Sequence, residues 1–119
     1  MNKSIVSGLF VIALLFFPIT ACTPHLEESQ LHFGIKAAQL DLWDEAIFRW
    51  KKAIQFTPNS AAAHNNLAVA YEKKGLWEKA KKEYEIALKL NPNHKFIISN
   101  YENFKRNYES EKNGQDEKK

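Results

Sequence analysis

The chain has 119 residues, a length that accommodates one small domain. Its net charge of +3 is too small to indicate nucleic-acid binding, and its one cysteine excludes an internal disulfide or a zinc site built from several cysteines. Hydrophobic residues make up 45% of the chain and charged residues 26%, so most of it is expected to fold.

Residues 1–21 have the pattern of a secretory signal. Lys3 precedes an almost wholly apolar run over residues 5–17. This run is shorter than the roughly 20 residues that a transmembrane helix needs. A basic start followed by a short apolar core is typical of a signal peptide, which is removed from the mature protein and takes no part in its fold.

The single cysteine, Cys22, directly follows this segment. Ile19, Thr20 and Ala21 precede it. An aliphatic residue three positions before a cysteine, followed by two small residues, resembles the lipobox of bacterial lipoproteins. The resemblance implies cleavage before Cys22 and attachment of acyl chains such as palmitate, and two or more chains hold a protein stably on a membrane. Residues 22–26 would then be a lipidated tether.

The resemblance also bears on location. Thr23 is not the aspartate that retains lipoproteins at the inner membrane in many two-membrane bacteria. The protein is therefore expected in the bacterial cell envelope, on the outer membrane and facing the periplasm. Two alternatives are an uncleaved signal anchor and ordinary secretion with a free thiol.

An internal repeat with a period of 34 residues covers the middle of the chain, as units 27–60 and 61–94. Identical residues recur at this spacing: Leu42-Trp43 with Leu76-Trp77, Ala46 with Ala80, Ala53 with Ala87 and Pro58-Asn59 with Pro92-Asn93. Two such copies predict two similar structural units.

Each unit is expected to form a pair of antiparallel helices, over 27–40 and 44–56 and over 60–74 and 78–90. Small residues at matched positions would let the helices approach closely: Gly34, Ala46, Ala53, Ala68, Ala80 and Ala87. Large residues would fill the space between them: Phe33, Trp50, Leu67, Tyr71 and Tyr84. Proline lacks a donor and disfavours helix before it, so Pro58 and Pro92 end the second helices. Gly75 permits a left-handed cap.

These features resemble tetratricopeptide repeats. The second unit carries Leu67-Ala68-x-x-Tyr71, Gly75, Ala80-x-x-x-Tyr84-x-x-Ala87 and Pro92. The first carries Phe33-Gly34-x-x-Ala37, Ala46-x-x-x-Trp50-x-x-Ala53 and Pro58. It departs from the family at Ala37, where an aromatic residue is expected, and Gln30 and His64 stand where a tryptophan often opens the motif. The resemblance implies an all-α fold, a short α-solenoid of two helix hairpins.

A C-terminal capping helix is expected over residues 95–109. Ile97, Tyr101, Phe104 and Tyr108 recur at helical spacing and form one apolar stripe. Glu102 and Lys105 stand where a further repeat would need an apolar contact, which indicates the end of a solenoid. Residues 110–119 are polar without periodicity and are expected to be disordered.

No pattern indicates catalysis. The four histidines are scattered without metal-ligand spacing, and the chain has no nucleophile motif and no glycine-rich phosphate loop. We expect structural or solvent-exposed histidines, no enzyme, no metal and no cofactor. The lysines between positions 73 and 89 alternate with acids at i,i+4 spacing, as in Glu78–Lys82 and Lys79–Glu83, and predict a salt-bridged, solvated helix face.

The resemblance implies a binding groove for a protein or peptide partner, lined by the first helix of each pair. The predicted groove residues are Leu31, Ile35, Asn65, Asn66, Val69, Glu72, Lys73 and, from the capping helix, Asn103. Ala38, Ser99 and Asn100 would lie beside them. Asparagine amides offer both a donor and an acceptor to a peptide backbone. Alternatively, these residues are only solvated or contact the cap. Trp43 and Trp77 are expected to pack between repeats rather than serve as exposed anchors.

The resulting hypothesis is a membrane-anchored lipoprotein that acts as an adaptor or scaffold for other proteins in the envelope, in a pilotin-like or assembly role. One alternative is a self-associating structural lipoprotein that dimerises through Phe96, Tyr101 and Phe104. Another is a regulator of cell-wall enzymes.

Overall fold

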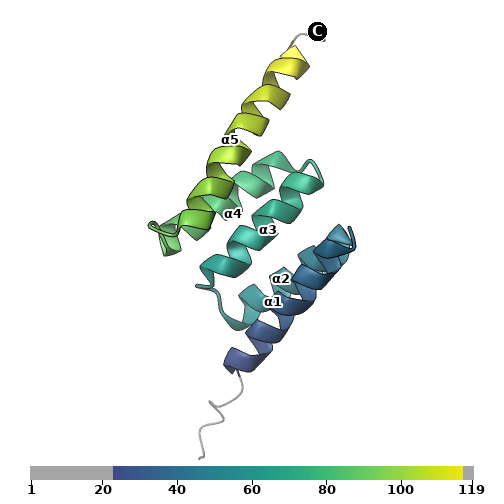
Figure 1. The fold of residues 1–119 in the computed structure, drawn as a ribbon, viewed down its shortest axis with the longest axis vertical. Coiled ribbons are helices and arrows are strands. Elements are labelled where there is room, and N and C mark those ends of the chain that lie inside the picture. The colour runs from purple at the N-terminus through teal and green to yellow at the C-terminus, as the bar shows by residue number, and fades with distance from the viewer. Residues whose placement is uncertain (1–22, 117–119) are drawn as a thin grey trace, which may run out of the picture.

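Five helices follow one another in the part of the chain that the computed structural model describes, residues 23–116. They are α1 (Thr23–Gln39), α2 (Trp43–Phe56), α3 (Ala61–Lys73), α4 (Trp77–Leu90) and α5 (Lys95–Asp116). The first four form two hairpins, α1 with α2 and α3 with α4, and α5 packs on the second hairpin. In Figure 1, α1, α3 and α5 lie side by side, with α2 and α4 behind them. The predicted all-α solenoid with a C-terminal helix is confirmed.

Both hairpins turn through the same backbone motif. In the second hairpin the N–H of Leu76 donates to the C=O of Tyr71 at 2.8 Å, and the N–H of Gly75 donates to the C=O of Glu72 at 2.9 Å. This pair of bonds closes a helix around a left-handed residue. Gly75 has the required positive φ, 69°, and its predicted role as a left-handed cap is confirmed.

The first hairpin repeats this motif without glycine. Leu42 donates to Ala37 at 2.9 Å and Asp41 donates to Ala38 at 3.1 Å, both between backbone groups. Asp41 occupies the left-handed position, with a φ of 56°. Aspartate tolerates this conformation better than most residues because its short polar side chain can bond locally.

The loops after α2 and α4 contain residues that stop one helix or start the next. Pro58 and Pro92 stand two positions after the ends of α2 and α4, as the sequence predicts. The Oγ of Ser60 accepts a hydrogen bond from the N–H of Ala63 at 3.3 Å and caps α3. This bond satisfies a donor that the helix itself leaves free.

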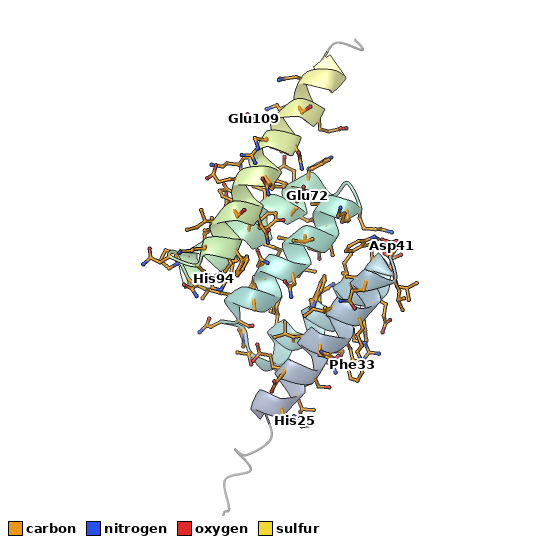
Figure 2. All side chains as sticks on the ribbon, in the orientation of Figure 1. His25, Phe33, Asp41, Glu72, His94 and Glu109 are labelled. Carbon is orange, nitrogen blue, oxygen red and sulfur yellow. The ribbon has the colours of Figure 1, made fainter. Side chains whose placement is uncertain are left out.

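The core follows the repeat. Ala46, Ala53, Ala68, Ala80 and Ala87 are all fully buried, so the predicted close helix approach is confirmed. Trp50, Leu67 and Tyr84 are each at most 3% exposed and fill the space between helices. Phe33 is 48% exposed, and the prediction that it fills the core is wrong. It lies on the side of α1 away from α3, where no described helix covers it (Figure 2).

Gly34 marks the closest approach within the first hairpin. A methyl group at this position would lie 2.7 Å from the ring carbons Cδ1 and Cε2 of Trp50 and closer still to its Nε1. Trp50 is held there, because its Nε1 donates to the C=O of Leu31 at 3.3 Å. Only glycine therefore leaves room for this indole ring against α1.

The first helix begins earlier than predicted. α1 starts at Thr23, so the tether expected over residues 22–26 is helical from Thr23 onwards. Pro24 is compatible with this start, because the first turn of a helix needs no N–H donor. Cys22 and the signal segment 1–21 lie outside the described residues.

The last helix ends later than predicted. α5 continues to Asp116, so the expected disorder is wrong for residues 110–116; residues 117–119 lie outside the described part. The continuation is held by Tyr108, whose ring stacks on Phe104 at 5.6 Å and whose hydroxyl donates to Glu78 of α4. A polar segment without periodicity can therefore stay helical when the preceding turn is docked.

Candidate functional site

A shallow hollow of about 340 Å³ lies on the side of the solenoid formed by α1, α3 and α5. We call it the amide hollow. It is lined by Ile35, Ala38 and Gln39 of α1, Trp43 and Trp50 of α2, Asn65, Asn66 and Val69 of α3, and Asn100 of α5. Four of the eight predicted groove residues, Ile35, Asn65, Asn66 and Val69, therefore meet at one place.

One part of the amide hollow is apolar. Ile35 is 42% exposed, while Val69 and Trp43 are half-buried and pack against the two core clusters. The expected packing role of Trp43 is confirmed, and so is that of Trp77, which packs against the second cluster. The apolar part of the hollow is thus a fixed surface built on the core.

The other part is a chain of three side-chain amides. Asn100 Nδ2 donates to Asn65 Oδ1 at 3.1 Å, and Asn65 Nδ2 donates to Asn66 Oδ1 at 3.3 Å. Asn65 is only 8% exposed, whereas Asn66 and Asn100 are half-buried. The middle amide is therefore internal and positions the two outer ones.

The two ends of this amide chain have complementary chemistry. Among residues 23–116, neither the Asn66 NH₂ nor the Asn100 side-chain carbonyl has a further hydrogen-bond partner. One end is a donor and the other an acceptor. If all three amide groups were rotated by 180°, the free donor and the free acceptor would exchange ends, and one of each would remain. A peptide backbone offers the matching pair of groups, so the amide hollow suits an extended chain rather than one particular side chain.

Glu72 was predicted to line the groove, but both of its carboxylate oxygens are used inside the fold. Oε2 accepts from the Tyr84 hydroxyl at 3.0 Å and Oε1 accepts from Asn107 Nδ2 at 2.9 Å. Figure 2 shows Glu72 on α3 beside α5. This carboxylate joins α3 to both α4 and α5, and we leave it out of the binding surface.

The burial of Tyr84, together with its contact with Glu72, makes the stability of the fold depend on pH. Burial, and next the nearby Glu72 carboxylate, raise the pKa of Tyr84 above its ordinary value of 10.0. The folded chain therefore keeps this proton more tightly than the unfolded chain. The resulting stabilisation is complete below pH 10 and is lost as the pH rises above it, because there only the unfolded chain ionises readily.

We expect the free energy of unfolding to fall as the pH rises above about 10 and to fall less steeply in Tyr84→Phe, which has no hydroxyl to ionise. Near neutral pH this variant should lose about 1 kcal/mol with the hydrogen bond. Urea denaturation of both proteins between about pH 8 and pH 11 measures the two slopes. Equal slopes would contradict the assignment to Tyr84.

The three remaining predicted residues lie outside the amide hollow. Leu31 packs against the first core cluster, and its backbone carbonyl holds Trp50. Lys73 is exposed in the last turn of α3. Asn103 is exposed and accepts a hydrogen bond from Arg106 on the same helix.

The predicted salt bridges along α4 are not formed. Its acids turn to neighbouring helices: Glu78 accepts from Tyr108, Glu83 contacts His64, and Glu85 accepts from Tyr101 at 3.5 Å. Spacing along one helix could not reveal this, because the competing partners come from other helices. The acidic side chains of α4 therefore hold neighbouring helices together.

His64 is a structural residue, one of the two roles expected for the histidines from the sequence. Its Nδ1 lies 2.6 Å from Glu83 Oε2 on α4, and its Nε2 lies 3.0 Å from the C=O of Pro58. The matching positions of the first hairpin, Gln30 and Arg49, are also joined, at 3.3 Å. Within the described residues, no group of three or more histidine, cysteine, aspartate or glutamate side chains is arranged to hold a metal ion.

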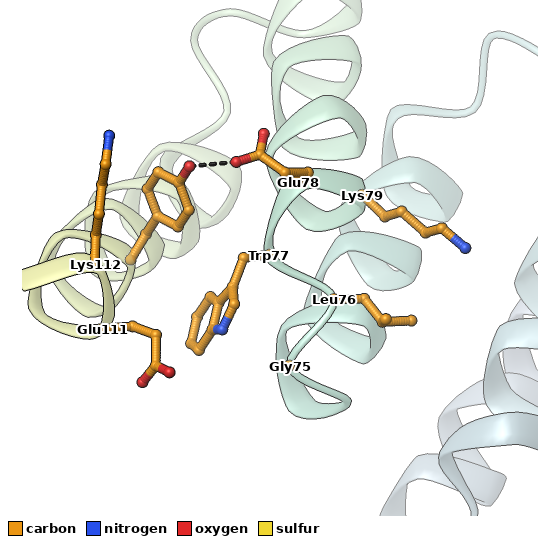
Figure 3. A pocket seen from close by; sticks show the side chains of 8 residues that line it. Gly75, Leu76, Trp77, Glu78, Lys79, Glu111 and Lys112 are labelled. Carbon is orange, nitrogen blue, oxygen red and sulfur yellow. Dashed lines mark hydrogen bonds between the residues drawn. The ribbon is translucent and has the colours of Figure 1, made fainter. Parts of the chain in front are cut away.

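A second hollow, of about 500 Å³, lies where the start of α4 meets the far half of α5. Trp77 projects into it, beside Glu78 (Figure 3). Tyr108 also lines it and donates a hydrogen bond to Glu78. Glu111 and Lys112 also line it, residues that the sequence placed in a disordered tail. This hollow is the wedge between two packed helices, and it follows from the unexpected length of α5.

The residues proposed for dimerisation do not form an exposed face. Phe104 is 1% exposed, and Tyr101 packs against Tyr84 with ring centroids 6.0 Å apart. Only Phe96, at 76%, is largely exposed. The prediction of a dimer face on these three aromatic residues is therefore wrong, because two of them hold α5 to the second hairpin.

Comparisons with known proteins agree with this architecture. A family model described as tetratricopeptide repeat matches residues 61–94, the predicted second unit, and one described as TPR repeat matches residues 38–75. The chain is also 45% identical over 58 residues to the mouse (Mus musculus) protein O-mannosyl-transferase TMTC4. That match covers 49% of this chain and 8% of the mouse protein. Across residues 23–116, no helix is long and apolar enough to cross a membrane.

Proposed function

We propose that this chain, which contains tetratricopeptide repeats and so is suited to protein partners, is a lipid-anchored adaptor of the bacterial cell envelope. It holds an extended segment of a partner protein in the amide hollow. Binding is non-covalent, and the chain carries out no chemistry on its partner. The observation that carries the proposal is the chain of three asparagine amides beside an apolar surface.

The amide hollow supports this proposal through its fixed geometry. Asn65 is internal and bonded on both sides, so the two outer amides are held in place before a partner arrives. A preorganised site loses less side-chain entropy on binding. The exposed Ile35 adds an apolar contact without demanding one particular sequence. Such a site suits capture of a backbone with modest side-chain selectivity, as an assembly or pilotin-like role requires.

The lipid anchor rests on the sequence around Cys22. The lipobox-like Ile19-Thr20-Ala21-Cys22 follows a short apolar segment. Diacylglycerol on the thiol and an acyl group on the new amine would hold the protein on a membrane stably, since two chains suffice. With Thr23 after the cysteine, we place the protein on the outer membrane, facing the periplasm.

Intact mass spectrometry of the protein purified from membranes tests the anchor. A mature chain that begins at Cys22 and carries two or three acyl chains is expected. The variant Cys22→Ser should remain unprocessed and unacylated. An unmodified full-length wild-type chain would remove the lipoprotein proposal and its membrane assignment.

Cross-linking from a defined position tests the amide hollow. A photo-reactive residue in place of Gln39, which lines the hollow, should capture a partner in the envelope, and one in place of the exposed Lys82 of α4 should not. Mass spectrometry then identifies the captured segment. Equal capture from both positions would show that the hollow is not the binding surface.

For that segment, we expect Asn66→Ala to weaken binding by about fivefold. The variant removes the free donor end of the amide chain, and one hydrogen bond to a peptide group contributes about 1 kcal/mol. Asn59→Ala, an exposed asparagine in the loop after α2, is the matched control and should bind as wild type does. Isothermal titration calorimetry with the synthetic segment measures both. Equal losses in the two variants would argue against the amide mechanism.

A further inference from the structure

The side of α1 that faces away from the second hairpin carries exposed apolar residues along its whole length. Leu26 is 40% exposed, Phe33 48% and Leu40 71%. With Ser29 and Lys36 between them, these residues are spaced three and four apart. Leu26 and Phe33 therefore form one stripe on the helix, which Leu40, the first residue after α1, continues. We call this stripe the outer face of α1.

In the second repeat, the equivalent face of the first helix is covered by another helix. Leu67 occupies in α3 the position that Phe33 occupies in α1, and it is 3% exposed because α2 packs over it. Ala70, which matches Lys36, is fully buried. In the second hairpin this side of the first helix is thus an interface, whereas among the described residues nothing covers it in the first.

The two ends of the solenoid differ in this respect. At the C-terminal end, α5 presents Glu102 and Lys105 to solvent, paired at 2.8 Å. A solenoid end that stays in water needs a polar outer surface of this kind. The outer face of α1 continues instead onto α2, where Phe48 is 50% exposed. The outer surface is therefore charged at the C-terminal end of the solenoid and largely apolar at its N-terminal end.

We propose that the outer face of α1 lies on the lipid surface to which Cys22 is anchored; this inference rests on the proposed lipid anchor. α1 begins at Thr23, the residue after Cys22, so no tether separates the anchor from the helix. Leu26 follows within about one turn. A helix of 17 residues is about 25 Å long, and its stripe extends from that first turn to its C-terminal end, so α1 lies along the membrane.

The charges around this face match an anionic lipid surface. The Arg49 guanidinium lies 5.5 Å from the ring centroids of both Phe33 and Phe48, and the Lys52 ammonium lies 5.8 Å from that of Phe48. Glu45 pairs with Arg49 at 2.6 Å and offsets part of this charge. Cations that flank apolar rings are typical of interfacial helices, where the rings enter the acyl boundary and the cations meet phosphate groups.

This arrangement would orient the whole protein. With α1 on the bilayer, the helices stack away from it in chain order, and α5 lies farthest from the lipid (Figure 1). The amide hollow, which extends from α1 to α5, then opens sideways above the membrane and is reached from the aqueous side.

Two variants of the full protein, each with one added cysteine besides the anchored Cys22, test the inference. Leu40→Cys places a thiol on the outer face of α1, and Phe96→Cys places one at the start of α5; these positions are 71% and 76% exposed, so neither substitution opens the core. Each protein, purified from membranes, is labelled with a nitrobenzoxadiazole fluorophore and reconstituted in vesicles of phosphatidylethanolamine and phosphatidylglycerol. Circular dichroism checks that both variants keep wild-type helicity, and Phe33→Cys serves as a second position on the outer face.

We expect brominated lipids to quench the probe at position 40 at least about threefold more than the probe at position 96, and aqueous iodide to do the reverse. Iodide that reaches both positions equally, in protein that floats with the vesicles, would overturn the inference and leave the anchor intact. Shielding of position 40 from both quenchers would show that protein, such as a second copy, covers the face, and would also overturn it. Labelling of Cys22 itself in the wild type would remove the anchor and the inference together.

Discussion

Phe104→Ala is expected to lower the free energy of unfolding by about 3–5 kcal/mol, the range for deleting a fully buried aromatic ring. Phe104 is 1% exposed and lies at the centre of the contact between α5 and the second hairpin. Its ring centroid lies 5.2 to 6.2 Å from those of four others: Tyr84, Tyr108, Tyr101 and Trp77. In a fold of two repeats this loss would release α5 and expose the second core cluster.

The matched control is another phenylalanine of the same helix. Phe96 is 76% exposed, so Phe96→Ala should change the free energy of unfolding by no more than about 0.5 kcal/mol. Guanidinium denaturation of both variants, followed by far-ultraviolet circular dichroism, gives the comparison. A small effect of Phe104→Ala, equal to that of Phe96→Ala, would mean that α5 is not the cap of the solenoid.

Gly34→Ala is expected to destabilise the first hairpin by about 2 kcal/mol or more, although alanine is the better helix former. The new methyl group would lie 2.7 Å from two ring carbons of Trp50. That ring is 3% exposed and is bonded through Nε1 to the Leu31 carbonyl, so it cannot withdraw without losing both packing and a hydrogen bond. Denaturation monitored by circular dichroism and by tryptophan fluorescence measures the loss.

Gly114→Ala separates this steric effect from helix propensity. Gly114 also lies within a helix, α5, and a methyl group added there would meet nothing within 4 Å. The substitution should therefore leave the protein unchanged or stabilise it by up to about 1 kcal/mol. If Gly34→Ala were equally harmless, the close approach of α1 to Trp50 would be wrong.

Much of the fold was predictable because each matched position occurs in both repeats, so two observations support each assignment. Gly75 identified the left-handed turn, and Pro58 and Pro92 identified the helix ends, through local backbone chemistry alone. The ends of the array were not predictable in this way. The continuation of α5 to Asp116 depends on contacts between side chains 30 residues apart, such as Tyr108 with Glu78. The start of α1 at Thr23 lies in a segment that the sequence analysis interpreted as a lipidated tether.

The candidate site was predictable only in outline. Matching helix faces correctly brought Asn65, Asn66 and Val69 to one surface, since those positions follow from helical spacing. Which side chains remain available depends on their partners across the fold. Glu72 is occupied by Tyr84 and Asn107, and no pattern within α3 reveals either contact.

The amide chain joins the second unit to α5. Asn100 of α5 stands 34 residues after Asn66, and it donates to the Asn65 of the unit before it. A further copy of residues 61–94 inserted after position 94 would place its own asparagine in the same relation to Asn65. Each added unit would then lengthen the amide chain by one more pair of asparagines. The second repeat and α5 therefore contain the pattern from which a longer amide surface, for a longer peptide, would be built.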